Sequence, residues 1–177
     1  MIKRVCETLG YDVEKFAKKI KSHISWAKNK NLSPLQYRHA NIEVSDIEQI
    51  SKAYEFYEKE LQHCNALDFD DILLKTVDLF EREPAVLGEY ASRFQYVHVD
   101  EYQDISKARF SLLNSMRKSN NYDLFCVGDD WQSIYRFAGS DIGYILNFEK
   151  YWGPTEISKI ETTYRFTQKL IEISGNF

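Results

Sequence analysis

The chain has 177 residues, of which 44% are hydrophobic and 28% are charged. This composition is typical of a globular protein with room for one domain and a small appendage. No run of eighteen apolar residues suggests a membrane span, and the N-terminus does not resemble a signal peptide. Three cysteines and four histidines are scattered without metal-ligand spacing, which predicts structural roles for them and a reducing, cytoplasmic location.

The charge is distributed unevenly along the chain. The first 44 residues hold nine Lys or Arg and four Asp or Glu, a net charge of +5, which leaves −9 for the remainder of a chain whose total is −4. A surface that contacts nucleic-acid phosphates would have this bias, and Lys18, Lys19 and Lys21 are its candidates. A solvated helix face would have the same bias.

The first third of the chain is predicted to be helical. Asp12 is typical of a helix N-cap, and the apolar residues that follow it recur at helical spacing. Ser45 and Glu48 form a capping-box pattern before a second periodic stretch. The predicted helices cover about 12–28, a short stretch from Pro34, and 46–63.

Helices and strands alternate in the rest of the chain. Short apolar runs predict strands, and periodic stretches between them predict helices. This alternation is typical of an α/β fold with a parallel sheet. The predicted helices lie at 69–82, 84–91, 105–118, 141–150 and from 167 onward, and the predicted strands lie at 95–100, 122–127 and 157–161.

Polar residues follow two of these strands directly. Asp100 and Glu101 end the first strand, and Asp129, Asp130 and Gln132 follow the second. Because the carboxyl ends of parallel strands meet at one sheet edge, where open α/β folds bind ligands, we expect both clusters in one site. Asp100 could hold Mg²⁺ while Glu101 orients or deprotonates a water, as in metal-assisted phosphoryl transfer. The same acids and amide could instead serve only as helix caps.

Four ordered segments resemble motifs of the UvrD/Rep-like superfamily-one DNA helicases, and among these the helicase IV type most closely. The resemblance implies a partial RecA-like domain, which is a three-layer α/β fold of the P-loop NTPase type with parallel strands, preceded by a helical subdomain. The matching segments are Leu67–Leu73 at the return from the inserted helical subdomain, Asp100–Asp104 as the Walker B segment, Val127–Tyr135 as the motif after it, and Thr162–Phe166 as motif IV.

The resemblance also implies roles for individual residues. Gln132 would sense the γ-phosphate and the attacking water, and Arg165 would stabilise charge on the γ-phosphate. Tyr164 would stack on the adenine base. Tyr135 or Phe137 would stack on a base of single-stranded DNA, a contact that tolerates any sequence. Without the resemblance, Arg165 would be read as a surface arginine and the three aromatic residues as core residues.

The chain departs from the family pattern in two ways. Many relatives have Tyr-x-Trp-Arg-Gly-Ala where this chain has Tyr135-Arg-Phe-Ala-Gly-Ser140, so contacts made by the missing arginine are not implied. The chain also lacks a Gly-x-x-x-x-Gly-Lys-[Ser/Thr] loop, which holds the phosphates of Mg-ATP, and the motifs that follow motif IV. We therefore expect an internal helicase fragment that is inactive alone, with residues 1–64 as the helical subdomain and residues 65–177 as the partial motor domain.

Three functions follow from these observations. The first is a fragment of an ATP-dependent DNA helicase or translocase that couples Mg-ATP hydrolysis to 3′–5′ movement on single-stranded DNA, in DNA repair. Its partners would be single-stranded or partly duplex DNA and the remainder of the helicase, with no membrane and with self-association through an open sheet edge. The second is a non-catalytic module, binding nucleic acid or protein, that keeps the helicase scaffold. The third and least favoured is a metal-dependent nuclease built on Asp100, Glu101, Asp104, Asp129 and Asp130.

Overall fold

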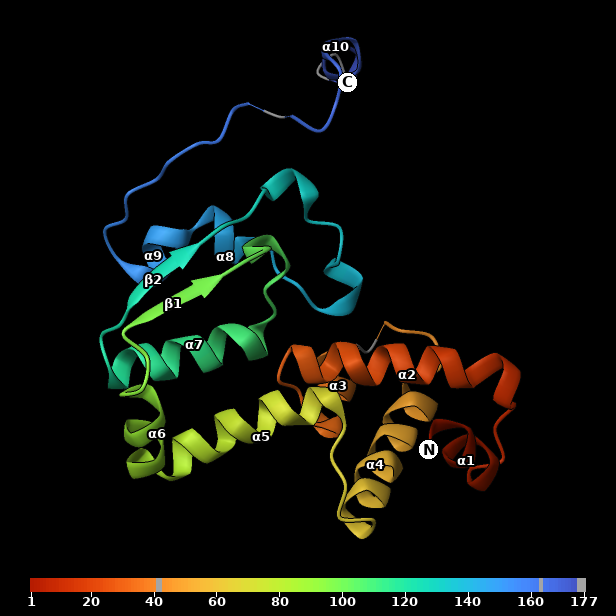
Figure 1. Cartoon of the computed structure of the whole chain (residues 1–177). Helices are drawn as coiled ribbons and strands as arrows, with labels where there is room; N and C mark the ends of the chain where they lie inside the picture. The colour runs from red at the N-terminus through yellow and green to blue at the C-terminus, as the bar shows by residue number, and fades with distance from the viewer. Residues whose placement is uncertain (41–42, 163, 175–177) are drawn as a thin grey trace. The chain divides into compact units, whose positions relative to one another are not determined.

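The structure is a computed structural model that describes residues 1–40, 43–162 and 164–174. It contains two compact units, residues 1–146 and residues 147–177. The described residues are mostly helical and form one parallel sheet of two strands (Figure 1). The α/β class is therefore confirmed in this coarse form. None of the described helices is long and apolar enough to cross a membrane.

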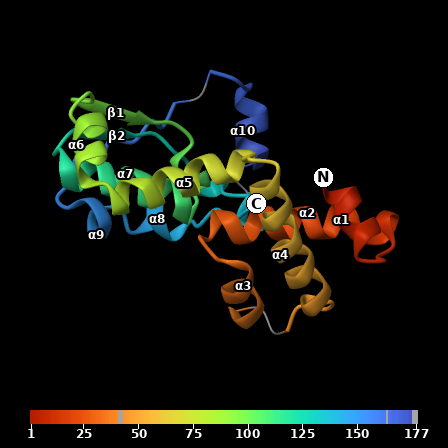
Figure 2. The same cartoon turned by 90° about the horizontal axis from the view of Figure 1, so that it is seen from below.

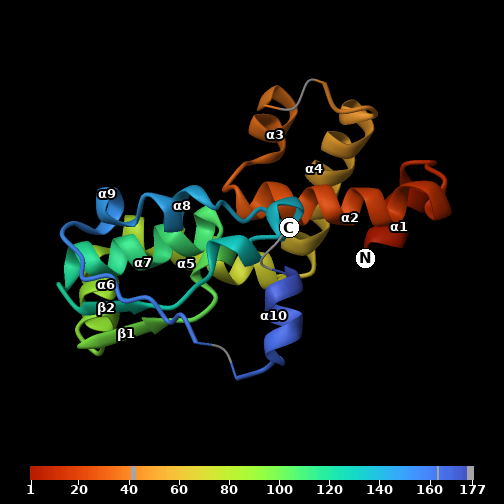
Figure 3. The ribbon, with the colours of Figure 1, turned by 90° about the horizontal axis from the view of Figure 1, so that it is seen from above.

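The first four helices share one core. Apolar residues of α2 that recur every three or four positions, among them Ile20 and Ile24, are buried in it, as the sequence predicts. Asp12 caps this helix, since its side chain accepts a hydrogen bond of 3.0 Å from the Lys15 N–H. Figure 3 shows α1 beside the N-terminal end of α2. The four helices are α1 (Ile2–Thr8), α2 (Val13–Asn29), α3 (Pro34–Ala40) and α4 (Ile47–His63).

The capping box predicted at Ser45 and Glu48 is wrong. Helix α4 begins at Ile47 after Asp46, which has a left-handed backbone (φ 62°) and makes no side-chain cap. The Ser45 hydroxyl, which would have formed the cap, instead accepts a hydrogen bond of 3.1 Å from Lys19 Nζ. The same ammonium group donates to the Ser45 carbonyl at 3.2 Å. The Glu48 carboxylate pairs instead with Arg38 at 2.7 Å.

Helix α5 leads from these helices to the sheet. It spans Phe69–Arg82 and contacts α2 at one end and both α6 (Pro84–Ala91) and α7 (Lys107–Ser119) along its length (Figure 2). Its N-terminus has a reciprocal capping box that the sequence analysis missed, in which the Asp68 side chain accepts from the Asp71 N–H and the Asp71 side chain accepts from the Asp68 N–H.

A buried lysine ties α2, α4 and the start of α5 together. The Lys28 side chain is 1% exposed, and its Nζ lies 2.8 Å from Glu58, 2.8 Å from Asp68 and 2.7 Å from Asp71. Burial alone would lower the pKa of Lys28, but the hydrogen bonds to these carboxylates raise it above its usual value. Lys28 therefore stays charged, and it does not belong to a basic surface.

The sheet consists of β1 (Tyr96–Val99) and β2 (Asp123–Cys126), paired in parallel from Tyr96 with Asp123 to Val99 with Cys126. This confirms the first two predicted strands and the helix between them. The alternate residues Val97, Val99, Leu124 and Cys126 are half-buried, whereas their neighbours along each strand are exposed. The burial therefore follows the two-residue period of a strand with one covered face.

The third predicted strand is wrong. Residues 156–162 adopt no regular structure, and Ile157 and Ile160 are 70% and 89% exposed. A strand forms only when a neighbour takes its N–H and C=O groups, and the second unit has no strand among its described residues. The predicted helix at 141–150 is interrupted at Asn147 into α8 (Gly143–Leu146) and α9 (Phe148–Trp152), and the last helix is α10 (Gln168–Ser174).

Candidate nucleotide site at the sheet edge

The loops that follow β1 and β2 are joined by the backbone. The Val127 N–H donates to the Val99 carbonyl at 2.8 Å, and the Tyr102 N–H donates to the Val127 carbonyl at 2.9 Å. These two bonds extend the ladder beyond the strands. The two polar clusters singled out in the sequence therefore lie at one edge of the sheet.

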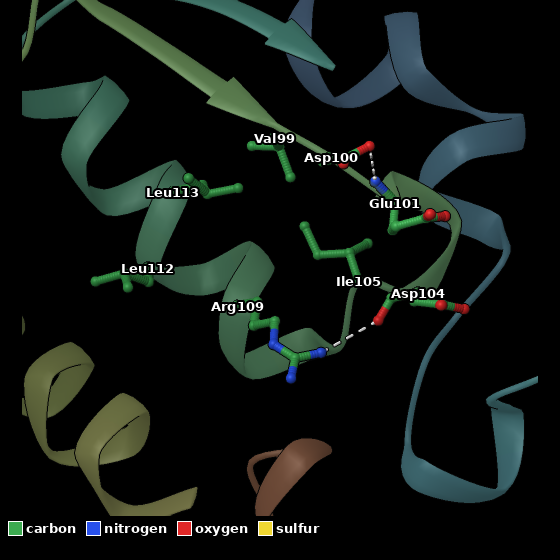
Figure 4. Close-up of a pocket in the computed structure, with 8 residues that line it drawn as sticks. All are labelled: Val99, Asp100, Glu101, Asp104, Ile105, Arg109, Leu112 and Leu113. Atoms are coloured by element: carbon green, nitrogen blue, oxygen red, sulfur yellow. Dashed lines mark hydrogen bonds between the residues drawn. The ribbon is translucent and has the colours of Figure 1, made fainter. Parts of the chain in front are cut away.

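Asp100 and Glu101 are both exposed at this edge (Figure 4). Glu101 has a left-handed backbone with φ 51°, which costs a non-glycine residue roughly 1–2 kcal/mol. The Asp100 carboxylate accepts a hydrogen bond of 2.9 Å from the Glu101 N–H and so supports this turn. Strained backbone of this kind is concentrated at functional sites.

Gln103 connects the two loops, although the sequence analysis assigned it no role. It is 1% exposed. Its Nε2 donates to Glu101 Oε2 at 2.6 Å, and its Oε1 accepts from the Asp129 N–H at 3.0 Å. One feature of the sequence could have indicated this role, because Gln103 is an amide residue among acidic residues just after a predicted strand. An amide buried there needs hydrogen-bond partners for both its NH₂ group and its oxygen.

Gly128 leaves room for this amide. A Cβ at position 128 would lie 2.8 Å from Gln103 Oε1 and 3.2 Å from the Gln103 backbone nitrogen. Both distances are shorter than ordinary van der Waals contact. The glycine of the Gly-Asp-Asp segment is therefore required by the close approach of Gln103.

The loop after β2 turns around Asp129. One oxygen of its carboxylate accepts from the Trp131 N–H at 3.1 Å, and the other accepts from Gln132 Nε2 at 2.7 Å. Asp129 thereby caps the short 3-10 helix η2 (Asp130–Gln132), a role that the sequence analysis left open for Gln132. The Gln132 side chain is exposed, and it is held by Asp129, whose N–H donates to Gln103.

A cavity of about 340 Å³ opens beside these acids. Burial, and secondly the charge of Glu101, raise the pKa of Asp104, while Arg109 opposes this shift. Asp104 Oδ1 is buried without a hydrogen-bond partner. Figure 4 shows the lining residues, which are Val99, Asp100, Glu101, Asp104, Ile105, Arg109, Leu112 and Leu113.

These carboxylates fit a weakly held magnesium ion better than a metal cage. Among the described residues, no three or more His, Cys, Asp or Glu side chains are grouped as metal ligands. Mg²⁺ bound with a nucleotide keeps several waters and needs only one or two carboxylates besides the phosphates. Asp100, which is exposed, could supply one of them.

The candidate DNA-stacking residues are on the surface. Tyr135 and Phe137 are 47% and 73% exposed, and their rings lie 5.8 Å apart. Tyr135 directly precedes the 3-10 helix η3 (Arg136–Ala138), and Phe137 belongs to it. This short helix contacts α2. The alternative that they are core residues is therefore wrong.

The three candidate lysines on α2 differ. Lys18 and Lys21 are exposed, whereas Lys19 is half-buried and pairs with Asp46 at 2.7 Å. Lys19 is thus less available for phosphate than its two neighbours.

Tyr164 and Arg165 belong to the second unit. Tyr164 is 94% exposed, and Arg165 is also exposed. Thr163, which belongs to the same motif, lies outside the described residues. The γ-phosphate and adenine roles of this motif stay predictions.

The fold and this site define a mostly helical α/β protein with acidic and amide side chains at the carboxyl edge of parallel strands, the usual ligand-binding edge of such sheets. Comparison with known families is more specific, because residues 1–152 match the UvrD/REP helicase N-terminal domain. The chain belongs to this family.

Similar proteins include three bacterial relatives named ATP-dependent DNA helicase PcrA. The chain is 36% identical to that of Leuconostoc citreum, 37% identical to that of Bacillus subtilis (strain 168) and 38% identical to that of Staphylococcus aureus (strain Mu50 / ATCC 700699). Each match covers 99% of this chain and 23 to 24% of the relative. The chain thus spans about a quarter of the length of these relatives.

Proposed function

We propose that the chain is the part of an ATP-dependent DNA helicase that carries the hydrolytic carboxylates and the residues that respond to the nucleotide. The observation that carries this proposal is the joining of the Asp100–Asp104 and Val127–Tyr135 segments at one sheet edge through Gln103. The helicase couples Mg-ATP hydrolysis to 3′–5′ movement on single-stranded DNA, and the polarity rests on the family resemblance. A relationship closest to the helicase IV type is part of the same proposal.

The proposed domains follow the same resemblance. Residues 1–64 are the inserted helical subdomain, and residues 65–177 are part of a RecA-like motor domain. The P-loop segment and the second motor domain come from the remainder of the helicase. DNA is the other partner.

In the proposed mechanism, each residue has a separate task. Mg²⁺, when bound with ATP, neutralises phosphate charge. Asp100 would hold the ion, and Glu101 orients the attacking water and accepts its proton. Gln132 and Arg165 interact with the γ-phosphate, and Tyr164 stacks on the adenine base. Tyr135 and Phe137 stack on DNA bases.

The test is Mg²⁺-dependent ATP hydrolysis, with and without single-stranded DNA. We expect none from the 177-residue chain alone, because it has no phosphate-binding loop. In the intact helicase, Glu101→Gln should abolish turnover and spare nucleotide binding, because the amide keeps the shape of the side chain but cannot accept a proton. The exposed Glu81→Gln is the matched control. If the intact helicase with Glu101→Gln still hydrolyses ATP, the role assigned to Glu101 is excluded. If the 177-residue chain alone hydrolyses ATP in a way that depends on Glu101, the phosphates are held by something other than a phosphate-binding loop.

A second candidate function is a non-catalytic module that binds single-stranded DNA. The exposure of Phe137, Lys18 and Lys21 favours it. Binding without ATP should weaken with salt, and replacing Lys18 and Lys21 by Ala should reduce the slope of log K against log salt by about 1.4, since each phosphate contact contributes about 0.7. Lys19→Ala should reduce it less, because Lys19 is paired with Asp46. Fluorescence anisotropy with a labelled oligonucleotide measures the slope, and equal effects of all three lysines would contradict the assignment.

A further inference from the structure

We propose that Gln103 is a positioning residue that fixes Glu101 and couples it to the Gly128-Asp129 turn. The inference deepens the proposed function and rests on it, because the effect on turnover presupposes that Glu101 activates the attacking water. Gln103 itself faces neither solvent nor the cavity, so it acts only through other residues.

The two hydrogen bonds of Gln103 fix the orientation of its amide. The Asp129 N–H can only donate, so the atom facing it at 3.0 Å must be Oε1. Nε2 is then directed at Glu101 Oε2, 2.6 Å away. The donated hydrogen bond restrains one carboxylate oxygen of Glu101, whose residue as a whole is exposed.

Two further hydrogen bonds and the missing side chain of Gly128 hold Gln103 in place. Its own carbonyl accepts from the Ser133 hydroxyl at 3.4 Å. The neighbouring Tyr102 is buried, and its N–H donates to the Val127 carbonyl at 2.9 Å. The absence of a side chain at Gly128 leaves space for Oε1. A displacement of the turn after β2 must therefore move the amide, and with it the carboxylate of Glu101.

Two substitutions at position 103 separate the two contacts. Gln103→Leu removes both hydrogen bonds at nearly constant volume. Gln103→Glu keeps an acceptor for the Asp129 N–H but places a carboxylate against that of Glu101, which repels it. Gln62→Leu, at an exposed position of α4, is the matched control.

The first readout needs no activity and uses NMR on the 177-residue chain. Hydrogen exchange of the Asp129 amide should be roughly ten-fold faster in Gln103→Leu, as expected for one lost hydrogen bond, and close to that of the unsubstituted chain in Gln103→Glu. Glu101→Ala should shift the side-chain amide protons of Gln103. An Asp129 amide unaffected by Gln103→Leu, or Gln103 side-chain protons unaffected by Glu101→Ala, would overturn the proposal.

The second readout is steady-state ATP hydrolysis by the intact helicase. Both Gln103 variants should lower kcat by about ten-fold or more with KM for ATP unchanged, because the water-activating group loses its orientation while nucleotide contacts remain. A kcat retained in Gln103→Glu would limit Gln103 to holding the turn and would overturn the coupling. If Glu101→Gln retains hydrolysis, the proposed function fails, and the NMR readout still decides whether Gln103 links the two loops. If Gln103→Leu does not fold, Gly128→Ala displaces Oε1 independently and should give the same faster exchange at Asp129.

Discussion

At the scale of single residues, Lys28 is the clearest case of a charge used for structure. Its ammonium is surrounded by the carboxylates of Glu58, Asp68 and Asp71. The Tyr57 hydroxyl also donates to Asp68 at 2.8 Å, and the Tyr57 ring lies 5.2 Å from Lys28 Nζ. One cation thus allows several carboxylates to be enclosed where three helices meet.

Replacing Lys28 by Met should destabilise the chain by about 3–5 kcal/mol, because it leaves the buried carboxylate of Asp71 and the half-buried ones of Glu58 and Asp68 without their cation. Urea denaturation followed by far-ultraviolet circular dichroism measures the loss. Lys21→Met, at an exposed position of the same helix, should change the free energy of unfolding by less than about 0.5 kcal/mol. Similar small effects for both variants would show that the charge of Lys28 is dispensable.

At the scale of secondary-structure elements, a glycine sets the contact between α2 and the loop that carries Tyr135 and Phe137. Gly139 has φ 97°, and a Cβ there would lie 2.7 Å from the Asn29 Cβ. Asn29 is itself fixed, since its Nδ2 donates to Asp70 at 2.9 Å and to the Ser25 carbonyl at 3.0 Å. The loop can approach α2 this closely only with glycine at position 139.

Gly139→Ala and Gly10→Ala separate backbone strain from collision. Gly10 has φ 70°, and a Cβ there would meet no atom within 4 Å, so its substitution should cost only roughly 1–2 kcal/mol of backbone strain. Gly139→Ala should cost about 1–3 kcal/mol more, because the methyl group also collides with Asn29. Urea denaturation of both variants tests this difference. Equal losses would mean that the loop moves away from α2 without penalty.

The sequence predicts those elements whose contacts are local, and it does not predict those that depend on residues far away in the chain. The helix capped by Asp12 was predictable because its cap and apolar stripe are local. The failure of the cap predicted at Ser45 was not predictable, because the Ser45 hydroxyl accepts a hydrogen bond from Lys19, 26 positions away. The segment at 157–161 has strand composition, but composition does not supply a pairing partner. Gln103 was overlooked because its two partners meet only when β1 and β2 pair.

At the scale of the whole chain, the sheet has one exposed face. Tyr96 and Phe125, on neighbouring strands, are each 60% exposed, and the His98 ring lies 5.5 Å from that of Phe125. Within the described residues the sheet has two strands, so each has an unpaired edge. Exposed aromatic side chains beside open strand edges favour association between copies.

We therefore predict that the isolated chain self-associates through this face. Sedimentation should give a weight-average mass that rises above the 20.9 kDa of one chain as concentration increases. Phe125→Lys should shift association to higher concentration, because a charge in the contact must be desolvated or face its copy. Leu79→Lys adds the same charge on α5, where Leu79 is 44% exposed, and should leave association unchanged. A single-chain mass at every concentration, or equal effects of both substitutions, would contradict the prediction. The exposed aromatic face of the sheet would then remain in contact with water and would not be an interface between copies.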